Sequence, residues 1–199
     1  TTESDLTLPP RPSTDKGELS GIDLVVLHAS STLTAMERFV AHTAGEESAH
    51  FLIDWDGRVY QTLDLALVAH HTGSEAIDTR SVAIELVTPL AQDATPLPSQ
   101  ATGIERPMSQ RLRVQGQLVR AWGYTEAQMT SLSSLLGDLI RAMPRLDGTM
   151  LGGATTPMNA LSPSEREAVR GVIGALHVDP TSIDPGPGFD WAALREALR

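Results

Sequence analysis

Residues 22–28 read IDLVVLH, and this stretch decides the expected fold. It is mostly apolar and too short for a helix, so it is predicted to form a buried strand. The next strong strand candidate is SVAIELV at residues 81–87, with Val82, Ile84 and Leu86 on one face. Helical segments are interleaved with these strands. The pattern therefore predicts an α/β fold with a mixed central β-sheet flanked by helices.

Other segments carry clear local signals for turns and helices. Strands at residues 51–53 and 59–61 flank an Asp-Gly pair, which is typical of a hairpin turn. Thr34 and Glu37 have capping-box spacing, which predicts the start of a short helix. Longer or later helices are predicted from Thr125 to Met143, after Ser162, and from Trp191 to Leu198.

The remaining segments suggest one domain with long loop insertions. Residues 1–20 contain three prolines among polar residues and are expected to be a flexible lead-in. Residues 21–199 are expected to form a single domain. Residues 89–123 contain four prolines and many polar residues, so they are predicted to be a long excursion from the core.

The composition excludes several classes of function. The chain has 15 Lys+Arg against 25 Asp+Glu and a net charge of −10, which argues against a nucleic-acid partner. No apolar stretch is long enough to span a membrane. The absence of cysteine excludes disulfides, thiolate nucleophiles and sulfur-ligated zinc. Lys16 is the only lysine.

The first residues, TTESD, contain neither Met nor an apolar segment. Removal of a signal peptide would leave such a start, and so would a cloning boundary. Composition alone therefore leaves the localisation open.

Three side chains are candidates for chemistry. His28 closes an apolar strand, and Glu85 lies within one, where an unpaired charge would cost several kcal/mol. The structural alternatives are a hydrogen-bonded core histidine and a salt bridge from Glu85 to an arginine such as Arg80 or Arg58. Asp184 precedes a turn that two prolines and two glycines make rigid. Imidazole and carboxylate groups are suitable zinc ligands, although these residues are too common to be specific alone.

Seven short motifs between about residues 22 and 195 follow one another in the same order as in a known family. Together they resemble the zinc-dependent N-acetylmuramoyl-L-alanine amidases, whose fold is shared with peptidoglycan recognition proteins. The motifs are VVLH at 25–28, SAHFLID at 48–54, DGRVYQTL at 56–63, AHHTG at 69–73, RSVAIE at 80–85, YTEAQ at 124–128 and DPGP at 184–187.

The resemblance implies a role for each matching position. His28 matches the first Zn²⁺ ligand, Asp184 the last, and Glu85 the acid/base that activates the zinc-bound water. His50 and His71 are expected near the substrate. The implied reaction is hydrolysis of the amide between N-acetylmuramic acid and L-alanine in peptidoglycan or its fragments.

Two residues depart from the family pattern at positions that usually take part in catalysis. Ala175 follows Gly174 where the second zinc histidine is usual, so it is expected to face the substrate instead. His177 would point to the same side of an extended strand, which predicts it as a substitute ligand. Ser182 stands where a lysine commonly stabilises the oxyanion, and we expect Ser182 or Thr181 to act as a neutral donor. Loss of such a charged donor typically lowers the rate by roughly 10²–10³.

These departures leave three interpretations open. The chain is an active amidase with zinc held by His28, His177 and Asp184, or a degenerate amidase that binds peptidoglycan or muropeptides without cutting them. In the third, Ala175 is an introduced substitution that disables the metal site. The substrate class favours the periplasm or the exterior of the cell, and the cytoplasm stays open.

Overall fold

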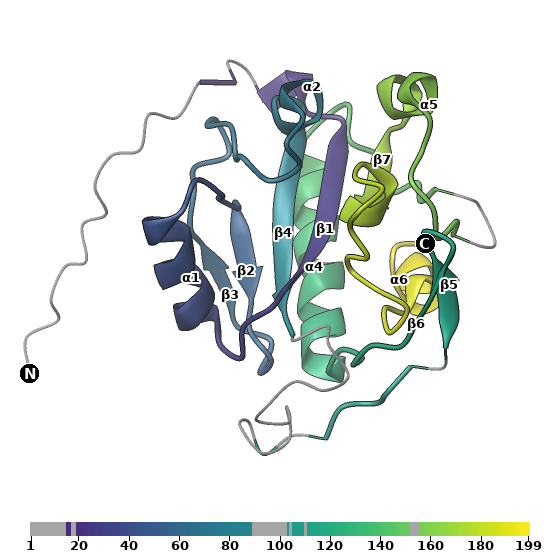
Figure 1. Cartoon of the computed structure of the whole chain (residues 1–199). Coiled ribbons are helices and arrows are strands. Elements are labelled where there is room, and N and C mark those ends of the chain that lie inside the picture. Colours follow the sequence, from purple (N-terminus) through teal and green to yellow (C-terminus); the bar gives the residue numbers. More distant parts are fainter. Residues whose placement is uncertain (1–14, 17–18, 89–102, 104, 110, 152–155) are drawn as a thin grey trace, which may run out of the picture.

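The computed structural model describes residues 15–16, 19–88, 103, 105–109, 111–151 and 156–199. Its centre is a five-stranded sheet in the order β3-β2-β4-β1-β7 (Figure 1). β1 is parallel to β4 and β7, β2 is parallel to β4, and β3 is antiparallel to β2. The strands are β1 (Leu24–Ser30), β2 (Phe51–Ile53), β3 (Val59–Gln61), β4 (Ser81–Val87) and β7 (Gly171–Gly174). The predicted mixed-sheet α/β fold is confirmed.

Helices cover the sheet, with α4 behind β1 and β4 in Figure 1 and α1 beside β2 and β3. A separate two-stranded hairpin, β5–β6, lies after the first four strands in the chain. The α-helices are α1 (Ala35–Ala44), α2 (Glu75–Asp78), α4 (Glu126–Ala142), α5 (Pro163–Ala168) and α6 (Trp191–Ala197), and the hairpin strands are β5 (Leu112–Val114) and β6 (Gln117–Val119). Short 3-10 helices occupy Leu19–Gly21 and Ala175–His177. No helix in the described part of the chain is long and apolar enough to cross a membrane.

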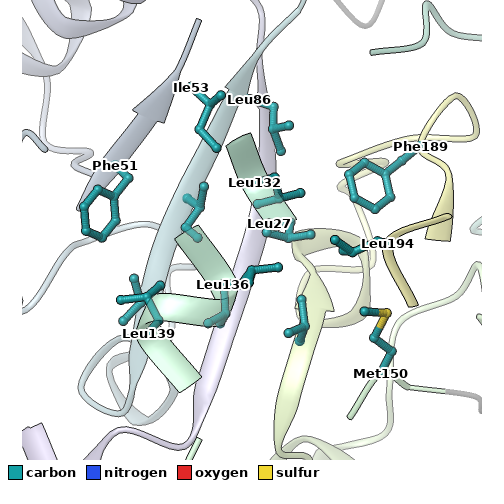
Figure 2. Packing of buried hydrophobic residues seen from close by; sticks show 14 of the residues in the cluster. Leu27, Phe51, Ile53, Leu86, Leu132, Leu136, Leu139, Met150, Phe189 and Leu194 are labelled. Atoms are coloured by element: carbon teal, nitrogen blue, oxygen red, sulfur yellow. The ribbon is translucent and has the colours of Figure 1, made fainter. Parts of the chain in front are cut away.

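The alternation of side chains along β1 and β4 divides the core into two faces. Every residue of both strands is buried, as expected when a parallel pair is covered on both sides. Leu27 of β1 and Leu86 of β4 pack against Leu132 and Leu136 of α4 (Figure 2). His28 is adjacent in sequence to Leu27, so it lies on the opposite face of the sheet.

The helix starts predicted from sequence are confirmed by their caps. The Thr125 hydroxyl accepts the Gln128 backbone N–H, and the Gln128 side chain accepts the Thr125 N–H in return. Ser162 begins α5 with a capping box that includes Glu165, and Asp190 caps α6. Such caps satisfy backbone donors that would otherwise lack a partner.

The long excursion predicted at 89–123 includes a hairpin that was not predicted from the sequence. Residues 89–102, 104 and 110 lie outside the described residues, but residues 112–119 form the β5–β6 hairpin. Its turn places Gln115 at φ 52° and Gly116 at φ 75°, and glutamine rarely signals such a turn. Tertiary contacts explain the geometry, since Gln115 Nε2 donates to the Leu176 carbonyl (2.6 Å) and its Oε1 accepts the Ala160 N–H (3.0 Å).

Part of the expected lead-in packs against the domain. Asp15 forms an isolated antiparallel bridge with Leu67, and the Lys16 N–H donates to the Ala66 carbonyl at 2.7 Å. Residues 1–14 and 17–18 lie outside the described residues. A domain boundary at residue 20 therefore stays a prediction.

The α4 face of the sheet should dominate stability. Leu136→Ala removes a fully buried side chain and should lower the free energy of unfolding by about 2–5 kcal/mol through lost burial and a residual cavity. Urea denaturation measures this change. Leu118→Ala, at a side chain that is 58% exposed, is the matched control and should change stability by less than about 0.5 kcal/mol. Equal losses in both variants would contradict this picture of the core.

Candidate functional site

A pocket of about 810 Å³ lies on the face of the sheet opposite α4. It collects side chains that are far apart in the sequence. Its lining includes His28 of β1, Arg38 of α1, Glu85 of β4, the segment His70–Gly73, Ala175, Ser182 and Asp184. The register of the sheet explains part of this gathering, because His28 and Glu85 are paired positions on neighbouring parallel strands. His28 does not end β1, which continues to Ser30.

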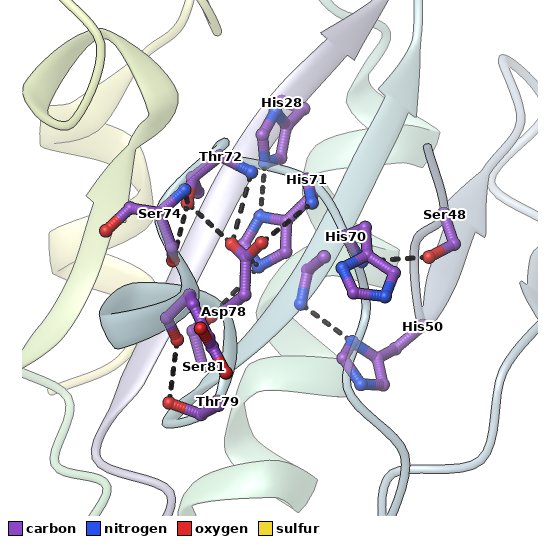
Figure 3. A network of polar contacts seen from close by, with 12 residues as sticks. His28, Ser48, His50, His70, His71, Thr72, Ser74, Asp78, Thr79 and Ser81 are labelled. Carbon is purple, nitrogen blue, oxygen red and sulfur yellow. Dashed lines mark hydrogen bonds and ion pairs between the residues drawn. The ribbon is translucent and has the colours of Figure 1, made fainter. Parts of the chain in front are cut away.

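His28 and His71 contact each other directly. His28 Nε2 lies 2.9 Å from His71 Nδ1, and His71 Nε2 lies 2.9 Å from Ser81 Oγ and 3.4 Å from Asp78 Oδ1 (Figure 3). Burial lowers the pKa of both histidines. The nearby carboxylate favours a proton on His71 Nε2. His71 Nδ1 then accepts a hydrogen bond, and His28 Nε2 is the donor.

Asp78 holds the segment that carries His71. Its Oδ1 accepts hydrogen bonds from the Thr72 hydroxyl (2.5 Å) and the Thr72 N–H (3.1 Å). The carboxylate is buried at the end of α2. Burial raises its pKa, and these hydrogen bonds partly offset the rise. Sequence analysis missed Asp78 because α2 has only four residues.

The Glu85 carboxylate is held by two residues of α1. Arg38 Nε donates to Oε2 at 2.5 Å and Arg38 Nη2 to Oε1 at 2.9 Å, while His42 Nε2 donates to Oε1 at 3.0 Å. The suggested salt bridge from Glu85 to an arginine is present, but its partner is Arg38 rather than Arg80 or Arg58. Those arginines pair instead with Asp23 and Asp56, respectively.

These contacts decide the charge of Glu85. Burial alone would raise its pKa, but the hydrogen bonds from His42 and Arg38 and their charges lower it to about 2. Glu85 is thus a carboxylate at neutral pH. A general acid/base works best with a pKa near the operating pH, so this environment opposes the role that the resemblance implies. Arg38 and His42 are four residues apart on a helix, a spacing that could have suggested a shared partner.

Asp184 and Ser182 line the pocket together. The Asp184 N–H donates to Ser182 Oγ at 3.1 Å. Burial raises the pKa of Asp184 to about 7, against a hydrogen bond from the Ala29 backbone, and the charge of Glu85 adds to the rise. Ala175 is also a lining residue and presents a methyl group there.

His177 is not brought to the pocket, so the structure does not place it where a substitute ligand is needed. The prediction assumed an extended strand, but Ala175–His177 is a 3-10 helix, in which side chains two residues apart point in different directions. His177 is fully buried. Its Nδ1 accepts the Gly174 N–H (2.9 Å) and its Nε2 donates to the Pro157 carbonyl (2.8 Å). Both ring nitrogens are therefore engaged with the backbone.

His50 is likewise a buried residue beneath the site rather than a lining residue of the pocket. Its Nδ1 accepts the Ala83 N–H at 3.0 Å, and its Nε2 lies 3.0 Å from the Leu67 carbonyl. Its side chain is fully enclosed. The structure therefore does not place His50 at the pocket, whereas His71 lines it.

A comparison with protein-family models identifies the family of this chain. The model described as N-acetylmuramoyl-L-alanine amidase matches residues 18–187. The chain belongs to this amidase family. Among curated proteins, no sequence matches the chain significantly.

Solved structures show the same fold. The selenomethionine derivative of AmpD has 20% identity and a TM-score of 0.56, covering 96% of this chain and 93% of that protein. AMPDH3 from Pseudomonas aeruginosa, in complex with an anhydromuramic pentapeptide, has 18% identity and a TM-score of 0.59, covering 99% of this chain and 66% of that one. AmiD from E. coli, in complex with anhydro-N-acetylmuramic acid-L-Ala-D-γ-Glu-L-Lys, has 18% identity and a TM-score of 0.57, with coverages of 98% and 60%.

The residues of this amidase-family chain do not fit a three-ligand zinc site. His28 and Asp184 offer donor atoms to the pocket, but Ala175 offers none. His28 Nε2 is engaged with His71. Across the described residues, no group of three or more His, Cys, Asp or Glu side chains is arranged to hold a metal ion. A catalytic zinc needs three protein ligands and an open position.

The Glu85 cluster predicts a specific dependence of stability on pH. Folding lowers the pKa of Glu85 from 4.5 to about 2, so its contribution is complete above pH 4.5 and is lost as the pH falls toward 2. Between pH 5 and pH 2, the wild type should lose up to about 3 kcal/mol more unfolding free energy than Glu85→Gln. Urea denaturation at several pH values measures the difference. Glu126→Gln, at an exposed carboxylate of α4, should retain the wild-type slope. A parallel pH profile for Glu85→Gln would refute the assignment.

Proposed function

We propose that this chain binds a muropeptide in the pocket without hydrolysing the amide between N-acetylmuramic acid and L-alanine. The observation that carries this proposal is the methyl group of Ala175, which lines the pocket beside His28 and Asp184. Two donor residues remain where zinc catalysis needs three. The recognition surface is retained, whereas the metal chemistry lacks a ligand.

The dimensions and lining of the pocket support binding. Its volume of about 810 Å³ falls in the usual range for small-molecule sites, about 300–1,000 Å³. Backbone and side-chain polar groups of His70–Gly73 form one wall, and the Ser182–Asp184 turn contributes to another. AMPDH3 and AmiD, which share the fold, are solved with anhydromuramic peptides. The same class of molecule is the proposed ligand here.

The charge of the pocket favours a ligand that carries a positive group. Arg38 is the arginine among the lining residues, and its guanidinium is already paired with Glu85 and Glu47. Seven acidic residues line the pocket, namely Glu46, Glu47, Glu75, Asp78, Asp179, Asp184 and Glu85. A stem peptide with a lysine at its third position places an ammonium group among these charges. N-acetylmuramoyl-L-Ala-D-isoglutaminyl-L-Lys is therefore a suitable probe.

Zinc-dependent hydrolysis, the competing function, makes larger demands on this chain. His177 would have to break its hydrogen bonds with Gly174 and Pro157 and leave the core to become a ligand. Glu85 would have to exchange protons while paired with Arg38 and His42. Ser182 offers a neutral hydroxyl in place of an ammonium. Binding requires none of these changes. A ligand of this class favours the periplasm or the exterior of the cell and does not exclude the cytoplasm.

The proposal predicts binding without turnover. Isothermal titration with the muramyl tripeptide should give a dissociation constant in the micromolar range, and chromatography of the same mixture after prolonged incubation with added Zn²⁺ should detect no released L-Ala-D-isoglutaminyl-L-Lys. Asp78→Asn should weaken binding at least fivefold, because Asp78 orients the His71 wall. Release of tripeptide by the wild type would overturn the proposal in favour of hydrolysis, and absence of binding would overturn it entirely.

Restoring the missing ligand should restore metal binding. Ala175→His supplies an imidazole at a lining position beside His28 and Asp184. Zinc affinity, measured with a competing chromogenic chelator, should rise at least 100-fold. The matched control is Ala192→His, at an exposed position of α6, which should leave zinc affinity within threefold of wild type. If Ala175→His bound zinc no better than the control, the proposal that Ala175 deprives the pocket of a zinc ligand would fail.

A further inference from the structure

Lys16, the only lysine of the chain, lies beneath one wall of the pocket. Residues 15 and 16 make backbone contacts with the turn that precedes that wall. Asp15 bridges Leu67, and the Lys16 N–H donates to the Ala66 carbonyl at 2.7 Å. Leu67 is followed directly by Val68, which lines the pocket. The segment is therefore attached to the start of the wall formed by Val68 and His70–Gly73, here called the 68–73 wall.

The side chain of Lys16 joins this turn to the central sheet. Its Nζ donates to the carbonyl of Ser81, the first residue of β4, at 2.5 Å. It also lies 3.0 Å from Nε2 of His50. Ser81 continues the contact toward the site, because its Oγ lies 2.9 Å from His71 Nε2. One amine thus connects β4, His50 and the turn that begins the 68–73 wall.

The hydrogen bonds of His50 indicate which protonation state of the Lys16 amine suits this contact. His50 Nδ1 accepts the Ala83 N–H, so neutral His50 carries its proton on Nε2 and donates it toward the Leu67 carbonyl. That N–H also faces Lys16 Nζ. An ammonium group has no lone pair to accept it, whereas a neutral amine has one. The contact is therefore most favourable when the amine is neutral.

The electrostatic surroundings agree with this geometry. Burial lowers the pKa of Lys16 to about 8, and the charge of Asp78 opposes the shift. Burial, followed by the charge of Lys16, lowers the pKa of His50 to about 3. Burial also lowers the pKa of His71. Between pH 7 and pH 9 these two histidines stay neutral, so Lys16 is the group near this turn whose charge changes.

We infer that Lys16 is a positioning residue, which fixes the 68–73 wall against β4 and so sets the shape of the ligand pocket. Lys16 is not among the residues that line the pocket. Its effect passes through Leu67, His50 and Ser81 to the wall. The inference rests on the proposed function only for the consequence that muropeptide affinity depends on Lys16.

The closing experiment compares wild type with Lys16→Met, which keeps the length of the side chain and removes its nitrogen. Arg58→Met, at a side chain that is 75% exposed on the β2–β3 hairpin, is the matched control. In hydrogen–deuterium exchange, amides of residues 66–73 should exchange at least tenfold faster in Lys16→Met than in wild type. Amides of α4 should be unchanged, which excludes global unfolding.

Affinity supplies a second readout that a merely structural role would not move. From pH 7 to pH 9, wild-type affinity for the muramyl tripeptide should rise about threefold more than that of Lys16→Met, because the amine becomes a better partner for the His50 N–H, whereas the deprotonation of Asp184 acts on both proteins. The ligand's own lysine, with an ordinary pKa of about 10.4, stays mostly charged over this range. Lys16→Met should bind at least fivefold more weakly than wild type, and should show only the rise in affinity that is due to Asp184.

The outcomes separate the two proposals. Unchanged exchange of residues 66–73 in Lys16→Met would overturn the positioning role, whatever the affinity. The positioning role would also be overturned if Arg58→Met showed the same faster exchange and the same loss of affinity as Lys16→Met. If exchange increased as expected but wild type bound no muropeptide, Lys16 would still fix the wall, and the proposed function would fail on its own test.

Discussion

The structure depends on the pairing of β1 with β4 along seven buried residues. Because side chains alternate across a strand, this pairing sends Leu27 and Leu86 to α4 and sends His28 and Glu85 to the other face. A shift of one residue in either strand would place a charged group in the apolar layer. The register that builds the core therefore also sets the position of the site.

A buried carboxylate on the second face requires compensation, and this requirement shapes α1. Glu85 is 2% exposed, so its charge would be costly without partners. Arg38 and His42 provide them from successive turns of one helix. The same contacts that make Glu85 tolerable also hold its pKa low and leave little of it free for proton transfer. In this chain, stability and acid/base chemistry make opposite demands on one side chain.

Sequence reasoning succeeded where local patterns and tertiary structure agree. The apolar run of β1, the alternation of β4 and the capping box at Thr125 all predict elements that the structure contains. It failed where few residues carry the signal, as in α2 and in β7 with its two glycines. The extended geometry assumed for His177 failed because the chain turns into a 3-10 helix directly after β7.

The parts of the site that sequence could predict differ in kind from those that it could not. Motif order located His28, His71, Ser182 and Asp184, all of which line the pocket. It could not show what neutralises Glu85, because Arg38 is 47 residues away in the sequence. It also gave no reason to connect Lys16 with the site, since their proximity depends on a bridge to Leu67 that leaves no local pattern.

The shape of the pocket and the positions expected to carry the metal chemistry depend on different residues. Its shape depends on Asp78 with Thr72, on His71 with Ser81, and on the attachment of the 68–73 wall. None of these contacts uses Ala175 or Ser182, where the metal ligand and the charged donor would stand. A substitution at those two positions therefore removes chemistry at little expense to the shape. On the proposed function, a fold whose geometry is fixed in this way recognises a muropeptide without a complete set of metal ligands.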